Sequence, residues 1–373
     1  MKIGFDAKRA FSNNTGLGNY SRDTIRLLSE NYPDKLFFLF TPKEKKNNRI
    51  SSITKKKNTV VHTPISLLDK LLPLYWRSRS IIKELSNNKI EIYHGLSNEI
   101  PLGIEKTSIK TVVTIHDLIF IRYPHFFTNI DKKIYYTKFK SSCKRADKII
   151  AISQQTKKDI INFFNIPAEK IEVVYQGCNE IFKKEASENQ KKNSIKKYNL
   201  PENFLLYVGT IEERKNLLTL LETIKELPNE KLVIIGDGRS YKKKCLNYIS
   251  ENHLSERVWF LNKISLEEMA NIYQLAQIMI YPSIFEGFGI PIIEALFSKL
   301  PVITSKGGCF IEAGGPDSRY INPSSITEIK EAIIEIKKSP QLRKKMAQNG
   351  LKYAKKFTDD RIASNLMLVY RNL

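Results

Sequence analysis

The sequence is poor in cysteine and lacks apolar runs of membrane-spanning length. Its 373 residues include four cysteines that form no CxxC pair, namely Cys143, Cys178, Cys245 and Cys309. Such scattered thiols favour a reduced, cytoplasmic protein over a disulfide framework or a cysteine metal site. The N-terminus has the pattern of a β-strand instead of a signal segment, and no apolar run approaches the roughly 20 residues of a spanning helix. We therefore expect a cytoplasmic protein whose only membrane contact would be peripheral, at the inner face of the plasma membrane.

Acidic residues are few compared with basic ones. The chain carries 61 Lys and Arg against 39 Asp and Glu, which gives a formal net charge of +22. This excess favours anionic partners (nucleic acid, an anionic lipid surface or phosphorylated substrates) without choosing among them. The basic residues are spread along the chain and accompany no recognised reading motif, so we expect no specific nucleic-acid partner. The sequence does not indicate an oligomeric state.

Short apolar runs alternate with longer helical patterns along the whole chain. This alternation predicts an α/β protein with parallel sheets covered by helices, and the length suits two such domains. A lysine-rich stretch with little apolar periodicity indicates a linker at 183–199, between domains at 1–182 and 200–356, and an amphipathic helix follows at 357–373. The expected strands are 2–6, 36–40, 91–94, 110–115, 148–152 and 171–175 in the first half, and 204–209, 231–235, 258–261, 278–281 and 301–304 in the second.

Glycines and histidines follow strands in the first half. Gly16 and Gly18 come after the first strand and just before an amphipathic helix, where backbone amides can bind an anion. His94 ends one expected strand, and His116 with Asp117 ends the next. Ligands of open α/β sheets bind beyond the carboxyl ends of strands, so these are candidate site residues. The alternatives are an ordinary glycine turn and structural histidines.

In the second half of the sequence a glycine again follows a strand, and two adjacent cations come after it. The strand at 204–209 ends in Gly209, and Arg214 and Lys215 follow immediately before a helix. Cations at a helix start oppose the helix dipole, and this local conflict with stability indicates a function. A guanidinium fork and an ammonium together would neutralise a diphosphate. The alternative is a solvated Arg–Lys pair. Gly236 ends the next strand in a similar turn.

Two carboxylates bracket the turn after the strand at 278–281. Glu286 lies in a loop with two glycines, and a helix is expected to open near Pro291 with Glu294 in its first turn. A strand, a glycine-bearing turn and a helix N-terminus form the usual site for phosphorylated ligands. The alternative is an ordinary turn with two solvated acids.

In combination, these segments resemble the donor-site motifs of retaining glycosyltransferases of the family 4 type (glycosyl transferases group 1), which include bacterial surface-polysaccharide enzymes. The resemblance rests on the pair Glu286 and Glu294 with seven residues between them, on Thr-Ile-His-Asp at 114–117, and on Gly-Thr-Ile-Glu-Glu-Arg-Lys-Asn at 209–216. It implies the GT-B fold, with two Rossmann-like domains whose parallel sheets face a central cleft. The first domain would bind the acceptor and the second the nucleotide sugar, and the last helix would cross back to the first domain.

The resemblance also implies the roles of individual residues. Catalysis would involve His116, Glu286, Arg214 and Lys215; the donor nucleotide would contact Gly16, Gly18, Gly209, Arg214, Lys215, Gly236 and Glu294; the donor sugar would contact His116, Glu286, Phe288 and Gly289; and His94 and Asp117 would border the acceptor cleft. Because no Asp-x-Asp motif stands in a metal-binding context, we expect no metal and no cofactor.

The implied reaction is transfer of a hexose, of the mannose or glucose type, from a GDP- or UDP-linked donor to a glycan or lipid-linked glycan acceptor in surface-polysaccharide synthesis. A nucleotide-sugar epimerase of the same architecture and a basic nucleic-acid-binding protein stay as alternatives. A further stretch, 67–83, mixes leucines and aromatic residues with four basic residues. It suits either an amphipathic helix on anionic lipid or an ordinary helix packed on the first sheet.

Overall fold

The computed structural model describes residues 1–44 and 49–373, which form two compact units. The first unit combines Met1–Gln176 with Thr358–Leu373, and the second is Gly177–Phe357. The stretch 183–199, expected as a linker, contains helix α10 (Glu188–Tyr198), which packs on α13 (Leu266–Leu275) of the second unit. The packing includes a hydrogen bond from Asn271 to the buried Ser194 hydroxyl at 3.1 Å. Apolar periodicity could not reveal a helix that is anchored through polar side chains.

The first unit is built on one parallel sheet. Among the described residues this sheet has seven strands in the order β3-β2-β1-β4-β5-β6-β7. The order reverses between β1 and β4, so their carboxyl ends form the topological switch point at which α/β proteins bind ligands. The strands are β1 (Lys2–Asp6), β2 (Leu36–Phe40), β3 (Thr59–His62), β4 (Ile92–Gly95), β5 (Lys110–Ile115), β6 (Lys148–Ala151) and β7 (Ile171–Val173).

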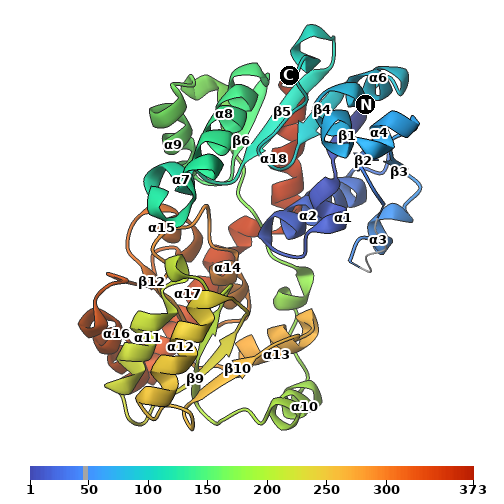
Figure 1. Ribbon diagram of the computed structural model, residues 1–373. Helices are drawn as coiled ribbons and strands as arrows, with labels where there is room; N and C mark the ends of the chain where they lie inside the picture. Colours follow the sequence, from blue (N-terminus) through green and yellow to red (C-terminus); the bar gives the residue numbers. More distant parts are fainter. Residues whose placement is uncertain (45–48) are drawn as a thin grey trace. The chain divides into compact units, whose positions relative to one another are not determined.

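Helices cover both faces of this sheet (Figure 1). Successive side chains of β4 point to opposite faces, as expected for a strand. Tyr93 lies in the core cluster that contains Trp76 and Cys143, while His94 contacts Tyr370 of the C-terminal helix on the other face. The helices are α1 (Lys8–Ser12), α2 (Gly16–Asn31), α3 (Ser51–Thr54), α4 (Leu67–Leu71), α5 (Pro73–Tyr75), the π-helical turn η1 (Trp76–Ser80), α6 (Ile81–Asn87), α7 (Ile119–Arg122), α8 (Asn129–Arg145), α9 (Gln154–Phe164) and α18 (Asp359–Arg371).

The second unit has the same kind of architecture. Its sheet is also parallel and six-stranded within the described chain, in the order β10-β9-β8-β11-β12-β13, so its switch point lies between β8 and β11. Its strands are β8 (Phe204–Val208), β9 (Lys231–Ile235), β10 (Val258–Leu261), β11 (Ile278–Tyr281), β12 (Val302–Ser305) and β13 (Arg319–Ile321). Besides α10 and α13, its helices are the turn η6 (Glu213–Lys215), α11 (Leu217–Lys225), α12 (Ser240–Glu251), α14 (Ile290–Phe297), α15 (Gly308–Gly314), α16 (Ile326–Lys338) and α17 (Pro340–Ala354).

The predicted α/β class with two parallel-sheet, Rossmann-like units is confirmed. Six of the expected strands have the observed bounds, namely 2–6, 36–40, 110–115, 231–235, 258–261 and 278–281. Strands β3 and β13 were not expected, because both are short edge strands that lack a continuous apolar run. Within the described ranges, no helix is both long and apolar enough to cross a bilayer.

A buried hydrogen-bonded chain ties α18 to the first sheet. The hydroxyl of Tyr370 is 2.7 Å from His94 Nδ1, and His94 Nε2 is 2.8 Å from the hydroxyl of Thr114. Thr114 in turn lies 2.9 Å from the hydroxyl of Tyr20 on α2. All of these side chains are buried away from water, so each polar atom needs its neighbour in this hydrogen-bonded series as its partner.

We expect Tyr370→Phe to lower the free energy of unfolding by about 1–3 kcal/mol, because a buried ring nitrogen of His94 loses its partner. Urea unfolding followed by circular dichroism measures the change. The control is Tyr75→Phe, whose ring is 48% exposed and should change stability by less than about 0.5 kcal/mol. Equal stability of the two variants would contradict a role for these buried hydrogen bonds in holding α18 on the sheet.

Candidate functional site

Glu286 is the centre of a charged cluster at the switch point of the second unit. It lies in the loop after β11, and Arg214 and Lys215 lie in the loop after β8. Lys215 Nζ forms an ion pair with Glu286 Oε1, and Arg214 Nη1 lies 2.8 Å from the same oxygen. The hydroxyls of Ser283 and Tyr281 donate to this oxygen at 2.5 and 3.0 Å. The structure therefore brings together three of the predicted site residues.

The environment of Glu286 keeps its carboxylate ionised. Burial by itself would raise the pKa of Glu286, but the charges of Lys215 and Arg214 outweigh this effect and lower the pKa to about 2. All of its contacts use Oε1, and among the described residues Oε2 has no hydrogen-bond partner. One oxygen of an ionised carboxylate is thus available to accept hydrogen bonds from a ligand.

Arg214 is held on three sides. Besides Glu286, it donates to the Phe285 carbonyl at 2.5 Å and pairs with Glu212 at 2.5 Å. Lys215 donates to the Tyr281 hydroxyl at 2.6 Å and lies 4.9 Å from the centre of that ring. The two cations that the sequence singled out are therefore fixed in position, and their side chains are only 16% and 11% exposed.

The glycines of this unit allow close approach between two loops. Gly209 and Gly236 have φ values of +152° and +158°. A Cβ atom on Gly236 would lie 1.9 Å from the Gly209 carbonyl oxygen, which no side chain can tolerate. The first requirement for Gly236 is thus backbone packing against Gly209, whereas the sequence analysis assigned it to the nucleotide. Its contact with a nucleotide stays a prediction.

Helix α14 begins directly after Gly289, whose φ is +122°. The Phe288 ring is buried and meets the Phe357 ring edge-on at 5.5 Å, so only the backbone of Phe288 can serve a ligand. Glu294 is the fifth residue of α14, just past the first turn, because the helix starts at Ile290, one residue earlier than expected.

A tyrosine from another helix orients Glu294. The Tyr273 hydroxyl donates to Glu294 Oε2 at 2.7 Å, and both side chains are buried. Sequence reasoning did not find Tyr273, since it lies 21 residues away on α13. The hydrogen bond to a charged acceptor fixes one oxygen of Glu294 and thereby the orientation of the other.

In the first unit, the two glycines of the N-terminal loop have different environments. Gly16 is exposed, and a Cβ atom there would meet no atom within 4 Å. Gly18 is buried, and a Cβ atom would lie 1.9 Å from the Asn13 carbonyl oxygen. Its amide donates to the Asn13 side chain at 3.2 Å, so Asn13 already caps the start of α2. The predicted diphosphate contact of this loop stays a prediction.

His116 directly follows β5 and is held in one tautomer. Its Nε2 lies 2.9 Å from the Leu96 carbonyl oxygen, which can only accept, so Nε2 carries the proton and Nδ1 is an acceptor. Asn98 accepts from the His116 amide at 3.0 Å, and Tyr20 meets the ring edge-on at 4.6 Å. Burial lowers the pKa of His116 to about 4. The ring is therefore neutral at physiological pH and can position a hydroxyl group.

His94 is part of the buried core of the first unit. It is fully buried, both ring nitrogens are bonded within the first unit, and burial lowers its pKa to about 3. The side chain points to the α18 face of the sheet, and its predicted contact with the acceptor stays a prediction. Asp117 is partly exposed and accepts a bond from the Ile119 amide at 3.2 Å.

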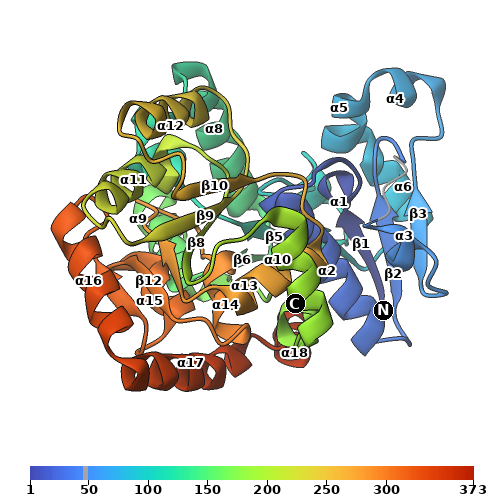
Figure 2. The same ribbon diagram turned by 90° about the horizontal axis from the view of Figure 1, so that it is seen from below.

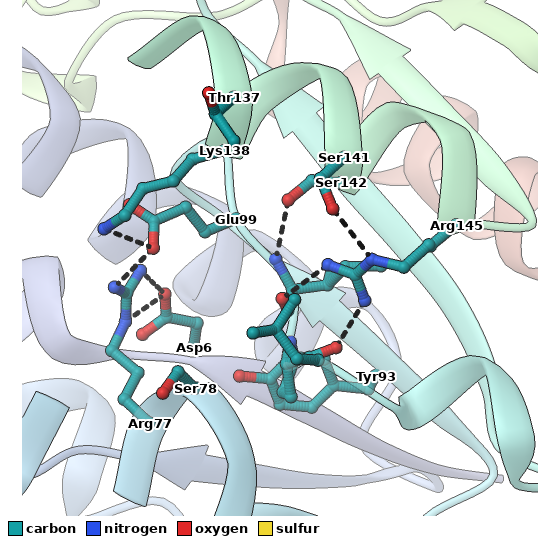
Figure 3. Close-up of a pocket in the computed structure, with 13 residues that line it drawn as sticks. Asp6, Arg77, Ser78, Tyr93, Glu99, Thr137, Lys138, Ser141, Ser142 and Arg145 are labelled. Carbon is teal, nitrogen blue, oxygen red and sulfur yellow. Dashed lines mark hydrogen bonds and ion pairs between the residues drawn. The ribbon is translucent and has the colours of Figure 1, made fainter. Parts of the chain in front are cut away.

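A cavity of about 200 Å³ lies at the switch point of the first unit (Figure 3). Asp6, at the end of β1, pairs with Arg77 at 2.6 Å, and Arg77 also pairs with Glu99 at 3.0 Å. Lys138 of α8 reaches Glu99 at 3.6 Å, and the ring of Tyr93 forms part of the wall. The hydroxyls of Ser78, Thr137, Ser141 and Ser142 also line it.

Sequence reasoning missed this cavity. Asp6 is the last residue of a recognised strand, which was the one available signal. Arg77 lies in the stretch 67–83, which the sequence left open between a lipid-facing helix and an ordinary helix packed on the first sheet, and in the structure Asp6 and Glu99 neutralise it. The hydroxyls, paired charges and aromatic wall are suited to a polyhydroxylated ligand.

No set of three His, Cys, Asp or Glu side chains in the described residues is placed to hold a metal ion. Metal-independent catalysis stays a prediction. What the residues of the second unit do offer is a fixed positive pair beside an ionised carboxylate.

Comparison with known proteins identifies similar sequences over both halves. The model of glycosyl transferases group 1 matches residues 188–353, and that of Glycosyltransferase Family 4 matches residues 15–180. The O-antigen chain mannosyltransferase RfbU of Salmonella typhimurium is 30% identical over 267 residues, which cover 71% of this chain and 70% of that protein. The O-antigen chain mannosyltransferase B of Escherichia coli is 26% identical over 295 residues, covering 78% and 76%.

Solved structures are similar over the full length. Anabaena Alr3699/HepE, in complex with UDP and glucose, matches with a TM-score of 0.78 at 17% identity, covering 100% of this chain and 99% of that one. The similarity shows that this chain has the GT-B fold of glycosyltransferases.

We expect the imidazole of His116 to stay neutral until the pH falls to about 4, because burial disfavours its charged form. A pH titration of the ring carbon shifts by NMR, assigned with His116→Gln, measures this. A free histidine titrates near 6.5 and serves as the reference. Protonation of His116 near that value would contradict the neutral tautomer.

We expect Tyr273→Phe to weaken nucleotide binding several-fold, because Glu294 loses the hydroxyl that orients it. Calorimetry with GDP and UDP measures the change. The control is a double-mutant cycle with Glu294→Ala, in which Tyr273→Phe should have little further effect. Additive losses would show that Tyr273 acts independently of Glu294.

Proposed function

Because the chain belongs to the glycosyl transferases of group 1, with a Glycosyltransferase Family 4 N-terminal half, we propose that it is a retaining hexosyltransferase of surface-polysaccharide synthesis. The donor would be a GDP- or UDP-linked hexose and the acceptor a glycan or lipid-linked glycan. The observation that carries the proposal is the cluster of Glu286 with Arg214 and Lys215 at the switch point between β8 and β11.

The cluster suits departure of a nucleoside diphosphate from an anomeric carbon. Negative charge develops on the departing phosphate oxygen, and preorganised cations stabilise that charge without having to reorganise. Arg214 and Lys215 would supply those cations. Glu286 Oε2 and His116 Nδ1, both available as acceptors, would hold hydroxyls of the transferred sugar.

We propose that configuration is retained by attack on the same face of the sugar. The bond between the anomeric carbon and the diphosphate breaks, and the bond to the acceptor oxygen forms on the side that the diphosphate leaves. The acceptor proton passes to the departing phosphate. His116 takes no part as an acid in this scheme, because burial keeps its ring neutral and Nδ1 carries no proton.

The hexose proposed for the first test is mannose. Two relatives carry names that describe O-antigen chain mannosyltransferases, whereas the Anabaena structure holds UDP and glucose. An assay with GDP-mannose and UDP-glucose therefore covers both parts of the proposal. Family membership favours a glycosyltransferase over the epimerase and nucleic-acid-binding alternatives.

The cavity of the first unit is proposed as the acceptor site. It lies at the switch point between β1 and β4, and it offers carboxylates, hydroxyls and the ring of Tyr93. Carboxylates accept hydrogen bonds from sugar hydroxyls, and aromatic rings pack against sugar faces.

We expect Arg214→Ala to lower kcat by about 30-fold to 1000-fold, equivalent to roughly 2–4 kcal/mol of transition-state stabilisation, and to change the Kd of the free nucleotide much less. Initial rates and calorimetry measure the two effects. Arg319→Ala is the control, because that arginine of the same unit is 49% exposed. Unchanged turnover in Arg214→Ala would refute the proposed role of the cluster.

A further inference from the structure

A short segment of the first unit exposes an unusual concentration of apolar side chains. Five leucines between Leu67 and Leu74, together with Ile65 and Tyr75, are between 48% and 76% exposed. Helices α4 and α5 contain no buried residue. Figure 2 shows both helices at the periphery of their unit. Single exposed leucines are ordinary, but a contiguous apolar patch marks an interaction surface.

The segment is held in place although α4 and α5 contribute no side chain to the core. At its C-terminal end Trp76 is fully buried and donates to Glu84 at 2.8 Å. Asp69 ties the segment together, accepting from the Ser66 hydroxyl at 2.8 Å and from the Ser80 hydroxyl at 2.6 Å. The backbone is thus anchored to α6 while the leucine side chains face outward.

The charges around the patch have one sign. Between residues 63 and 83 the only acid is Asp69, and its carboxylate is occupied by the two serines. Lys70, Arg79 and Lys83 are exposed. Arg77 does not count among them, because two carboxylates of the cavity neutralise it.

We propose that this apolar and basic surface docks on an anionic lipid bilayer. Leucines and a tyrosine flanked by lysine and arginine are typical of segments that lie in the membrane interface, where the apolar side chains enter the headgroup region and the cations contact anionic lipids. A second copy of the chain fits less well, because pairing this face with itself would bring six exposed cations together on molecules of net charge +22.

The docking surface is continuous with the proposed acceptor cavity. Helix α5 ends at Tyr75, and Ser78 of the following turn η1 lines the cavity. The Leu102 amide, on the cavity wall, donates to the Ser78 carbonyl at 2.7 Å. If the proposed function is correct, docking holds the cavity at the membrane surface, so the acceptor it receives is lipid-linked.

Co-sedimentation of the full-length chain with vesicles tests the proposal. We expect binding to vesicles that contain about 30% phosphatidylglycerol in phosphatidylcholine and little binding to phosphatidylcholine alone. Binding to the anionic vesicles should fall as sodium chloride rises to about 0.5 M, because salt screens the attraction. Equal binding to both kinds of vesicle, or none to either, would overturn the proposal.

Matched leucine variants localise the contact. Leu71→Ser/Leu74→Ser should lower the vesicle partition coefficient at least about 10-fold, because two apolar side chains no longer leave water. Leu246→Ser/Leu368→Ser removes two leucines that are 43% and 55% exposed elsewhere, and should leave binding unchanged. Equal effects of the two double variants would overturn the assignment to this segment.

Matched charge variants address the basic part of the surface. Lys70→Gln/Arg79→Gln/Lys83→Gln should lower binding to anionic vesicles at least about 10-fold. A control with the same change in net charge is Lys192→Gln/Lys196→Gln/Lys344→Gln, which alters exposed lysines of the second unit. If both triple variants lose binding equally, the attraction comes from net charge alone and the docking surface is wrong.

A tryptophan variant tests the contact by a gain of signal, whereas the variants above test it by a loss of binding. Tyr75→Trp should show a blue-shifted emission and quenching by brominated lipid when anionic vesicles are added, whereas Leu368→Trp should not. Light scattering of the chain without lipid tests the second-copy alternative. A dimer that Leu71→Ser/Leu74→Ser dissociates, with vesicle binding retained, would assign the patch to self-association and overturn the proposal.

The test of membrane docking can fail or succeed independently of the test of the proposed transferase function. Vesicle binding needs no nucleotide sugar, and calorimetry with GDP and UDP reports on nucleotide binding without any lipid. Vesicle binding without nucleotide binding would support docking and refute the transferase site. Activity on a water-soluble acceptor that Leu71→Ser/Leu74→Ser retains, with loss of activity on a vesicle-bound lipid acceptor, would support both.

Discussion

A carboxylate buried among cations is the constraint around which the second unit's site is arranged. Glu286 comes from the β11 loop, whereas Arg214 and Lys215 come from the β8 loop, and all three are mostly buried. Buried charges are tolerated only when they are paired, so removal of any one leaves another uncompensated. The pairing therefore locks the two loops together at the point where the strand order reverses.

Close backbone contacts support this arrangement. Gly236 lets its loop approach the Gly209 carbonyl, and Gly18 lets α2 start against the carbonyl of Asn13. In both places a side chain would push apart two segments that position charged or polar groups. The conformational freedom of glycine thus serves the scaffold of the proposed site before it serves any ligand.

Two histidines near the ends of adjacent strands differ in their surroundings, because His94 lies within its strand and His116 lies beyond the end of its strand. His94 lies within β4 and points toward α18, where it joins a buried chain of hydroxyls. His116 lies just beyond β5, where the Leu96 carbonyl fixes its tautomer and leaves Nδ1 as an acceptor. The first is part of the core, and the second is available for chemistry.

The sequence by itself determined the α/β class, most of the strands and the loops that carry Arg214, Lys215 and Glu286, because apolar periodicity and charge at strand ends are local features. It also marked the leucine-rich segment that carries the proposed docking surface. Only the tertiary structure decided the edge strands, helix α10, the orientation of Glu294 by Tyr273 and the cavity around Arg77. Each of these depends on contacts between residues far apart in the chain, such as Asp6 with Arg77, whose pairing leaves no local pattern. Burial of His94 and exposure of the leucines are likewise properties of the packed structure, because the side of a strand or helix that meets solvent is set by what packs against it.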